Sequence, residues 1–299
     1  MWFLTGQGAV TQLWHHRLKQ HDVPVHLLYH RQNKEERKTF RFHTNQGQAW
    51  TYQTNVLPLC QAPEGIQSLL LCAKAFHVQA IFEQLKPSLS DYADIILCHN
   101  GLGTIEPIVT QLKPNQRLWF LSTTHGALRL SQQETQHTGV GSSVLGLCHG
   151  NQQRSSHDIQ DLVQAGCIEL VDDIEQRLWL KLAVNSVINP LTAIHHCRNG
   201  ALSAQKWQMQ IEHLCEEFCA VANSAGINLT IEAVLMVVSR TIEQTAENYS
   251  SMHQDVYFKR QTEIEFITGY LLEIAKLKDI LIPTHTQVYQ EFLAQFCQP

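Results

Sequence analysis

The spacing of the apolar residues changes near residue 174, and this change constrains the fold more than any other feature of the chain. Before it, short apolar runs alternate with amphipathic stretches, which is the pattern of βαβ units built around a parallel sheet. After it, apolar residues recur three and four positions apart, as at Ile174, Leu178 and Leu182, which predicts helices. The sequence therefore predicts an α/β domain followed by an all-helical domain, with the boundary within residues 167–173.

In the first half, apolar runs bounded by turn residues predict strands, and amphipathic stretches between them predict helices. Strands are expected at 1–5, 25–29, 68–73, 94–98 and 117–121, and helices at 9–18 and 77–85. Residues 38–52 alternate and contain Asn45-Gln46-Gly47, which favours a hairpin over another helix. Short strands are then expected at 127–130, 136–140 and 144–147, before a helix at 156–165.

Composition argues against several classes of protein. The 299 residues hold 22 Lys plus Arg against 27 Asp plus Glu, a net charge of -5, whereas nucleic-acid-binding domains usually carry a basic stripe. No stretch approaches the roughly 20 apolar residues of a membrane span, and the N-terminus lacks the pattern of a signal peptide. We therefore expect a cytoplasmic protein that binds neither nucleic acid nor membranes.

The cysteines and histidines do not predict a metal site. The 9 Cys are scattered without a CxxC pair, which fits reduced thiols in a cytosolic protein and argues against disulfides and zinc. The 17 His include the pairs His15-His16 and His195-His196, but these lack Cys or carboxylate partners at ligand spacing. No metal is expected.

A glycine-rich turn follows the first predicted strand. Its residues are Gly6, Gln7, Gly8, Ala9, Val10 and Thr11, and a helix begins within it. Gly6 would permit a tight turn, and Gly8 would let backbone N–H groups approach a pyrophosphate at the positive end of the helix. Thr11 occupies the third glycine position of the dinucleotide-binding fingerprint, so helix and strand are expected slightly farther apart. The alternative is an ordinary strand-to-helix turn, but its place at the start of an α/β chain favours a nucleotide site.

The end of the second predicted strand indicates which nucleotide binds. An NAD enzyme usually carries Asp or Glu there, about 20 residues after the glycines. This chain has Arg31 instead, followed by Lys34, Arg37 and Lys38. A guanidinium offers two parallel N–H donors to a ribose 2'-phosphate, which an acid would repel. The prediction is NADP(H), and the alternative is a solvated basic loop.

Three polar side chains interrupt the apolar stripe of the helix predicted from Ile174. Lys181, Asn185 and Asn189 are spaced so that they share one side of this helix among apolar neighbours. Desolvation in an apolar cleft lowers the pKa of a lysine toward the range useful for proton transfer. Two amides on the same stripe can orient a polar ligand without adding charge. The alternative is a polar helix face or an interhelical hydrogen-bond network.

A second polar cluster, Asn248 to Ser251, precedes the helical stretch that carries Glu263. Ser250 or Ser251 could cap that helix, or the same helix end could equally hold a substrate carboxylate. Glu263 itself could hold a functional role or simply be solvated.

Two further candidates follow predicted strands. Lys74 and Asn100 lie after the strands at 68–73 and 94–98, at the edge where ligands bind in open α/β sheets. Gly101 and Gly103 would allow a ligand to approach the backbone closely. The alternatives are a strand-end cation and an ordinary turn.

The ordered series of motifs resembles the ketopantoate reductase (2-dehydropantoate 2-reductase) family over nearly the whole chain. The matching stretches are 6–14, 70–75, 99–106, 123–125, 178–202, 245–252 and 262–264. The run Lys181-Leu-Ala-Val-Asn185-Ser-Val-Ile-Asn189-Pro190-Leu-Thr-Ala-Ile is highly specific, and the ordered series is stronger than any one motif.

This resemblance implies a Rossmann-type NADP-binding domain at 1–170 and an all-helical substrate-binding and catalytic domain at 171–299, with the active site in the cleft between them. NADP(H) would be held by the glycine-rich turn, Arg31, Lys74 and Asn100, with Arg31 at the 2'-phosphate. Lys181 would be the general acid, and Glu263 a carboxylate that orients the substrate. The residues that would bind the substrate are Asn100, Lys181, Asn185, Asn189, Asn248, Ser251 and Glu263.

The activity that the resemblance implies is the reduction of ketopantoate to (R)-pantoate, in pantothenate and coenzyme A biosynthesis. Hydride would pass from NADPH to the C2 ketone while Lys181 protonates the oxygen. The alternatives are a reductase of another small 2-oxo acid on the same fold and a non-catalytic NADP(H)-sensing protein. Lys181 and Glu263 argue against a sensor, which needs no proton donor. The chain is expected to act as a monomer or homodimer.

Overall fold

The structure, a computed structural model, describes residues 1–154 and 156–296. The chain forms two compact units. Unit 1 comprises Met1–His99 and Thr104–Ile174, and unit 2 comprises Asn100–Gly103 and Glu175–Pro299. Within the described residues, no helix is long and apolar enough to cross a membrane.

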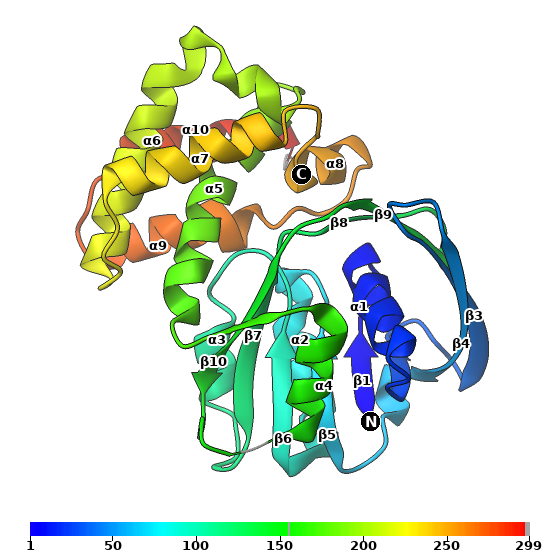
Figure 1. Ribbon diagram of the computed structural model, residues 1–299. Helices are drawn as coiled ribbons and strands as arrows, with labels where there is room; N and C mark the ends of the chain where they lie inside the picture. Colours follow the sequence, from blue (N-terminus) through cyan, green and yellow to red (C-terminus); the bar gives the residue numbers. More distant parts are fainter. Residues whose placement is uncertain (155, 297–299) are drawn as a thin grey trace. The chain divides into compact units, whose positions relative to one another are not determined.

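One mixed sheet forms the frame of unit 1 (Figure 1). In the described part of the chain it has 11 strands in the order β11-β10-β7-β6-β5-β1-β2-β4-β3-β9-β8. Their bounds are β1 Trp2–Thr5, β2 Val25–Tyr29, β3 Glu36–His43, β4 Ala49–Pro58, β5 Ile66–Leu71, β6 Leu89–Leu97, β7 Arg117–Thr123, β8 Gly126–Arg129, β9 Glu134–Gly139, β10 Ser143–His149 and β11 Glu169–Val171. The central strands β7, β6, β5, β1 and β2 all pair in parallel.

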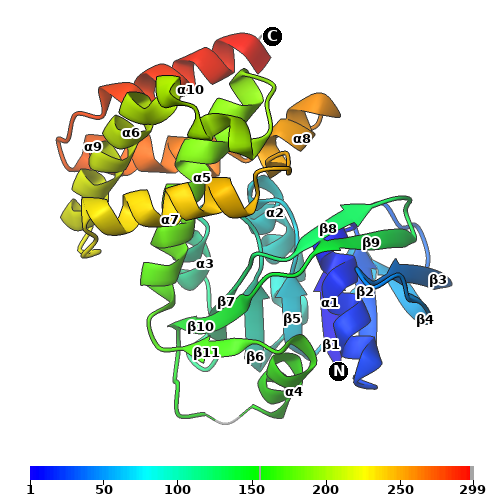
Figure 2. The ribbon, with the colours of Figure 1, turned by 45° about the horizontal axis from the view of Figure 1, so that its top comes forward.

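Helices cover both faces of these central strands (Figures 1 and 2). Their bounds are α1 Ala9–Gln20, α2 Ala75–Leu85, α3 Ile105–Val109 and α4 His157–Gly166. α1 and α4 lie side by side on one face, and α2 and α3 lie on the other. The core beneath α1 and α4 is built from fully buried side chains such as Trp2, Trp14, Leu27 and Leu162, because alternate residues of each strand face this layer.

The strands and helices predicted for the first half are confirmed, although several ends differ. β6 begins at Leu89 rather than at 94, and α2 begins at Ala75 rather than at 77. The predicted hairpin is β3 and β4, whose turn closes through the N–H of Thr44 on the carbonyl of Gln48, 2.8 Å, with Gly47 at φ +83°. The sequence did not predict α3 or β11.

A buried carboxylate joins β6, β7 and the segment after β10. Asp94 accepts hydrogen bonds from Arg117 Nε at 2.6 Å and Nη2 at 2.9 Å, from Trp119 Nε1 at 3.1 Å and from Arg154 Nη2 at 3.0 Å. Burial alone would raise the pKa of Asp94, but the hydrogen bonds from Arg117 and Ser156 and the positive charge of Arg117 outweigh it and lower this pKa. The buried Asp94 carboxylate and the buried Arg117 guanidinium therefore stabilise each other's charged form in the folded state.

Unit 2 is helical. Its helices are α5 Ile174–Ile194, which starts at the last residue of unit 1, α6 Gln205–Ser224, α7 Ile231–Gln244, α8 Ser251–Tyr257, α9 Tyr270–Leu277 and α10 Pro283–Phe296. A 3-10 helix spans Asn199–Ser203, and a π-helix spans Glu265–Gly269 immediately before α9. α5 contains Pro190 and continues beyond it to Ile194.

A carboxylate from α6 fixes the start of α10. Glu217 accepts the backbone N–H of Thr284 at 2.7 Å and the N–H of His285 at 2.9 Å, and its Oε2 lies 3.0 Å from His285 Nδ1. Burial would raise the pKa of Glu217, but these hydrogen bonds lower it to about 2. The contact satisfies two N–H groups that a helix start leaves without an internal partner.

Removal of the Asp94 carboxylate should destabilise unit 1 strongly. Asp94→Ala leaves the Arg117 cation buried without its counter-charge, so the free energy of unfolding should fall by about 3 to 5 kcal/mol. Asp91→Ala is the matched control on the same strand, because Asp91 meets Lys113 Nζ at 2.7 Å on the surface, and an exposed pair contributes at most about 1 kcal/mol. Urea unfolding measures the free energy of unfolding of both variants. Equal losses in the two variants would contradict this prediction.

The same experiment has an expected pH dependence. The pKa of Asp94 is lower in the folded than in the unfolded chain. The contribution of Asp94 to the free energy of unfolding is therefore complete above the ordinary aspartate pKa, and it is lost as the pH falls through the lowered pKa of the folded state. The gap in unfolding free energy between the wild type and Asp94→Ala should therefore narrow in acid.

Candidate functional site

The glycine-rich turn between β1 and α1 requires a glycine at its first position. Gly6 has φ +95°, and a Cβ there would lie 2.5 Å from the carbonyl oxygen of Cys72 and 2.9 Å from Thr11 Oγ1. No other residue fits without moving the backbone that follows β5. The turn is thus packed directly against the end of the neighbouring strand.

Thr11 fills the third glycine position with a buried hydroxyl. Its side chain is fully buried, and Oγ1 lies 3.2 Å from the carbonyl oxygen of Thr5 and 3.4 Å from that of Cys72. A hydroxyl carries one hydrogen, so the two carbonyls share it. The residue therefore ties α1 to the ends of β1 and β5.

The start of α1 is open to an anion. Gly8 precedes the helix in extended conformation, at φ -84° and ψ 170°, and has no side chain with which to cap it. A Cβ on Gly8 would meet none of the described atoms within 4 Å. The first turn holds Ala9, Val10 and Thr11, none of which is acidic. The N–H groups of this turn, together with the helix dipole, suit a phosphate group.

The other predicted cofactor residues of unit 1 follow strands adjacent to β1. Arg31 is exposed in the turn after β2, and half-buried Lys74 precedes the first residue of α2 after β5. Since β2 and β5 flank β1 in parallel, the segments after these strands leave the same edge of the sheet as the glycine-rich turn. The strand order reverses between β1 and β5, and α/β sheets bind nucleotides at such a reversal.

Asn100 contacts Glu263 within unit 2. Asn100 Nδ2 donates to Glu263 Oε2 at 3.2 Å. Glu263 is 4% exposed, so the alternative that it is solvated is wrong. It lies at the bend before the π-helix rather than inside a helix. A buried carboxylate that accepts from a side-chain amide is suited to orient a polar ligand.

The loop that carries Asn100 packs on the π-helix. The Leu102 N–H donates to the carbonyl of Phe266 at 2.8 Å, and a Cβ on Gly101, at φ +82°, would lie 2.3 Å from the same oxygen. Gly103 approaches Tyr270, whose ring lies 6.1 Å from that of Trp179 on α5. These contacts bring the loop, the π-helix and α5 together in one unit.

The polar stripe of α5 ends on a buried amide. Lys181 and Asn185 are half-buried, whereas Asn189 is 5% exposed. Among the described residues, Asn189 Nδ2 has no hydrogen-bond partner. A buried N–H group without a partner costs about 1 to 3 kcal/mol, which a ligand acceptor would recover. The Nδ2 group therefore does not take part in the interhelical hydrogen-bond network that the sequence left open as an alternative.

The segment Asn248 to Ser251 is tied to α5 just beyond Asn189. The Thr192 hydroxyl lies 2.7 Å from Ser250 Oγ, which accepts the N–H of His253 at 3.1 Å. Ser250 therefore caps α8, and the alternative that it caps the helix carrying Glu263 is wrong. The cause is a separate short helix, which ends at Tyr257 before the chain reaches Glu263. Asn248 and Ser251 are both exposed.

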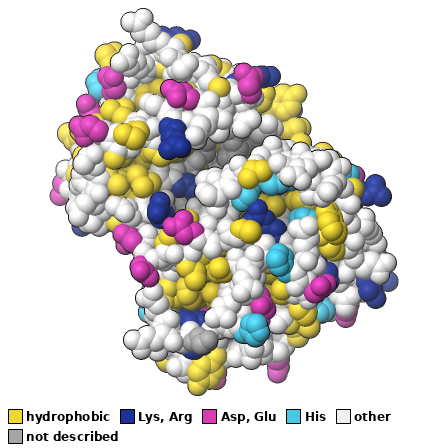
Figure 3. Space-filling view, in the orientation of Figure 1, with side chains coloured by type: hydrophobic (Ala, Val, Ile, Leu, Met, Phe, Trp, Pro, Cys, Tyr) yellow, Lys and Arg dark blue, Asp and Glu magenta, His cyan; other side chains and the backbone are white. Residues whose placement is uncertain are grey.

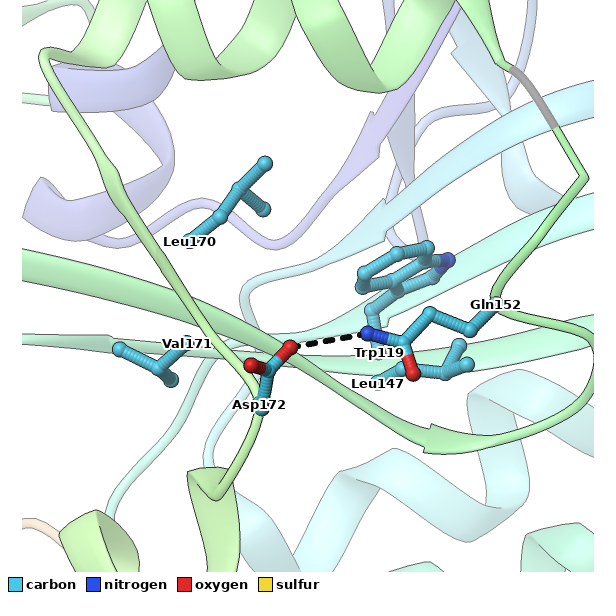
Figure 4. A pocket seen from close by; sticks show the side chains of 6 residues that line it. All are labelled: Trp119, Leu147, Gln152, Leu170, Val171 and Asp172. Atoms are coloured by element: carbon cyan, nitrogen blue, oxygen red, sulfur yellow. Dashed lines mark hydrogen bonds between the residues drawn. The ribbon is translucent and has the colours of Figure 1, made fainter.

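A small hollow at the β11 side of the sheet does not belong to these groups (Figure 4). Its lining residues are Trp119, Leu147, Gln152, Leu170, Val171 and Asp172. Gln152 Nε2 donates to Asp172 Oδ1 at 2.9 Å across it. None of the predicted site residues lines this hollow. Across residues 1–154 and 156–296, no cluster of three or more His, Cys, Asp and Glu is arranged to hold a metal ion.

Two solved structures share the fold over almost the whole chain. The ternary structure of D-mandelate dehydrogenase with NADH and anilino(oxo)acetate has a TM-score of 0.88 at 20% identity and covers 99% of both chains. The dimeric ketopantoate reductase from Staphylococcus aureus has a TM-score of 0.81 at 21% identity, covering 98% of this chain and 97% of that one. At these identities the matches show the fold alone, and the predicted fold class is confirmed.

Sequence comparisons identify the family. The family model Ketopantoate reductase PanE/ApbA matches residues 2–150, and Ketopantoate reductase PanE/ApbA C terminal matches residues 173–295. A 2-dehydropantoate 2-reductase of Vibrio cholerae is 39% identical over 225 residues, 75% of each chain. One from Yersinia pestis is 35% identical over 223 residues, 74% of this chain and 72% of that one. Both halves of the chain thus match in order, and the chain belongs to the ketopantoate reductase family.

Proposed function

We propose that this chain is an NADPH-dependent 2-dehydropantoate 2-reductase that reduces ketopantoate to (R)-pantoate. The observation that carries the proposal is the α5 stripe, which ends on the unpartnered Asn189 amide in a chain 39% identical to the Vibrio cholerae reductase. The proposal includes the two domains at 1–170 and 171–299, a cytoplasmic location, and action as a monomer or homodimer.

Lys181 is the general acid in this proposal. When bound, the nicotinamide of NADPH supplies a hydride to the C2 ketone. The ammonium group of Lys181 donates a proton to the ketone oxygen as negative charge develops there, and such assistance accelerates a reaction about 10²- to 10⁴-fold. The protein otherwise contributes closeness and orientation of the reacting groups.

The remaining polar groups of unit 2 position the substrate. Asn185 and Asn189 hold its hydroxyl side, and the Asn189 amide gains the acceptor that it lacks in the described structure. Asn248 and Ser251 hold its carboxylate side. Glu263 accepts from Asn100 at 3.2 Å, which fixes the carboxylate that orients the substrate.

The groups of unit 1 hold the cofactor. The N–H groups of residues 7–11 would hold the pyrophosphate, because Gly8 leaves open space at the start of α1. Lys74 and Arg31 would add positive charge at the same edge of the sheet, with Arg31 at the 2'-phosphate. Asn100, which belongs to unit 2, is the remaining proposed cofactor residue. No acidic residue of the first turn of α1 opposes the phosphates.

Ketopantoate should be strongly preferred to 2-oxoisovalerate, which lacks the 4-hydroxyl group. Without that hydroxyl, one of the two amides of α5 stays buried and unpaired, which should lower kcat/KM about 10- to 100-fold. NADPH oxidation followed at 340 nm measures both substrates. Asn189→Ala should reduce the preference. Equal kcat/KM values for the two acids in the wild type would contradict the assignment.

Replacement of Lys181 should abolish proton transfer without preventing cofactor binding. Lys181→Ala should lower kcat at least about 10²-fold while the Kd for NADPH stays unchanged. Lys276→Ala is the control, because Lys276 is an exposed lysine of α9 and should leave both quantities unchanged. A Lys181→Ala variant with near-normal turnover would exclude this residue as the acid.

The wild-type protein should bind NADPH more tightly than NADH. A 2'-phosphate that meets a guanidinium gains charge-assisted hydrogen bonds, so the two Kd values should differ by about tenfold or more. Fluorescence titration of the reduced cofactors measures both. Equal affinities would remove the argument for NADP(H).

A further inference from the structure

Arg129 is a cation that the proposed site does not use. It is the last residue of β8 and is exposed. Its Nη1 donates to the carbonyl oxygen of Gln7 at 2.9 Å, although the two residues are 122 positions apart in the chain. Gln7 stands between Gly6 and Gly8, so the guanidinium rests on the glycine-rich turn itself.

The glycine-rich turn that Arg129 contacts lies beside the end of β2, because Thr5 and Leu28 are register partners of the parallel strands β1 and β2. Tyr29 is the last residue of that strand, and its hydroxyl accepts from Gln12 Nε2 at 3.0 Å. Burial raises the pKa of Tyr29, and the hydrogen bond from Gln12 and the charge of Arg129 both oppose this rise. Arg129 therefore contacts the glycine-rich turn, and its charge acts on the end of the neighbouring strand β2.

The glycine-rich turn and the end of β2 are the places where two groups of a bound dinucleotide lie. In this fold class the pyrophosphate lies at the glycine-rich turn, and the ribose 2'-group lies at the end of the second strand. A cation that rests on the turn, beside the end of β2, is placed to meet the adenosine half of the cofactor. Gln7 accepts one of the five N–H donors of the guanidinium, which leaves Arg129 the geometry to meet a phosphate with two parallel N–H groups.

The strand that carries Arg129 is anchored at its other end. Arg17 Nη2 lies 2.8 Å from His125 Nε2, just before β8, and Arg17 Nη1 donates to the carbonyl of Gly166 at 2.6 Å. His125 Nδ1 also lies 3.2 Å from His137 Nε2 on β9. Figure 3 shows histidine and basic side chains grouped over this face of α1 and the β8–β9 hairpin. Arg129 is thus presented by a strand fixed to α1 before any ligand binds.

We propose that Arg129 is a further cofactor-binding residue, which contacts the 2'-phosphate of NADP(H) together with Arg31. This inference rests on the proposed function, since it names a contact of the same cofactor. It assigns to the β8–β9 hairpin a second cation of the phosphate site, in addition to Arg31 in the turn after β2. Arg129 would then contribute to the choice of NADPH over NADH.

Binding of nucleotides that differ only in the 2'-phosphate tests this contact directly. The variant is Arg129→Gln, and the probes are 2',5'-ADP, which carries a 2'-phosphate and no pyrophosphate, and 5'-AMP, which lacks both. Loss of a charge-assisted contact should weaken 2',5'-ADP and NADPH about 10- to 100-fold, with 5'-AMP and NADH nearly unchanged. Arg129→Lys should recover part of the affinity, because it keeps the charge but not the bidentate fork.

Arg240→Gln is the matched control, because it removes the same charge from an exposed position on α7. An unchanged Kd of Arg129→Gln for 2',5'-ADP would overturn the inference. Equal weakening of NADPH and NADH would place the contact at the pyrophosphate and overturn it as well. A wild-type protein that binds NADPH tightly but does not reduce ketopantoate would instead count against the proposed function. Urea unfolding of Arg129→Gln shows whether the variant keeps the wild-type fold.

Discussion

The turn after β1 depends on the absence of one methyl group. Because Gly6 has no Cβ, the carbonyl that follows β5 and the hydroxyl of Thr11 can both approach the turn, and α1 begins at once on its far side. That geometry points the first N–H groups of α1 at the edge of the sheet where β1, β2 and β5 end. The proposed cofactor residues of unit 1 share this edge because β2 and β5 flank β1 in parallel.

Local sequence patterns predict the elements whose burial follows from their own sequence. The apolar runs at β1, β2 and β5 are strands because both faces of a central parallel strand are buried, and the change of period at Ile174 marks the helical unit. The sheet beyond β4 is different, because β3 pairs with β9 across about 90 residues. No local signal carries a pairing of that kind, so neither this extension nor the position of Arg129 could be predicted.

The candidate site likewise contains some features that the sequence predicts and others that depend on contacts between distant segments. The spacing of Lys181, Asn185 and Asn189 on one helix is readable from the chain, since a helix has a fixed period. Glu263 contacts Asn100, 163 positions earlier in the chain. Ser250 caps a short helix that the sequence did not predict, and the Thr192 hydroxyl contacts that cap. These contacts arise from packing between distant segments, whose effect on any one residue cannot be seen in its neighbours along the chain.

The central claim is that the amine of Lys181 delivers a proton to the ketone oxygen of ketopantoate. A crystal structure of this chain with NADP⁺ and pantoate tests it most directly. The account predicts Lys181 Nζ within about 2.6 to 3.2 Å of the C2 oxygen of pantoate, with Asn189 bound to the substrate. Pantoate bound elsewhere, or a Lys181 side chain turned away from that oxygen, would contradict the account.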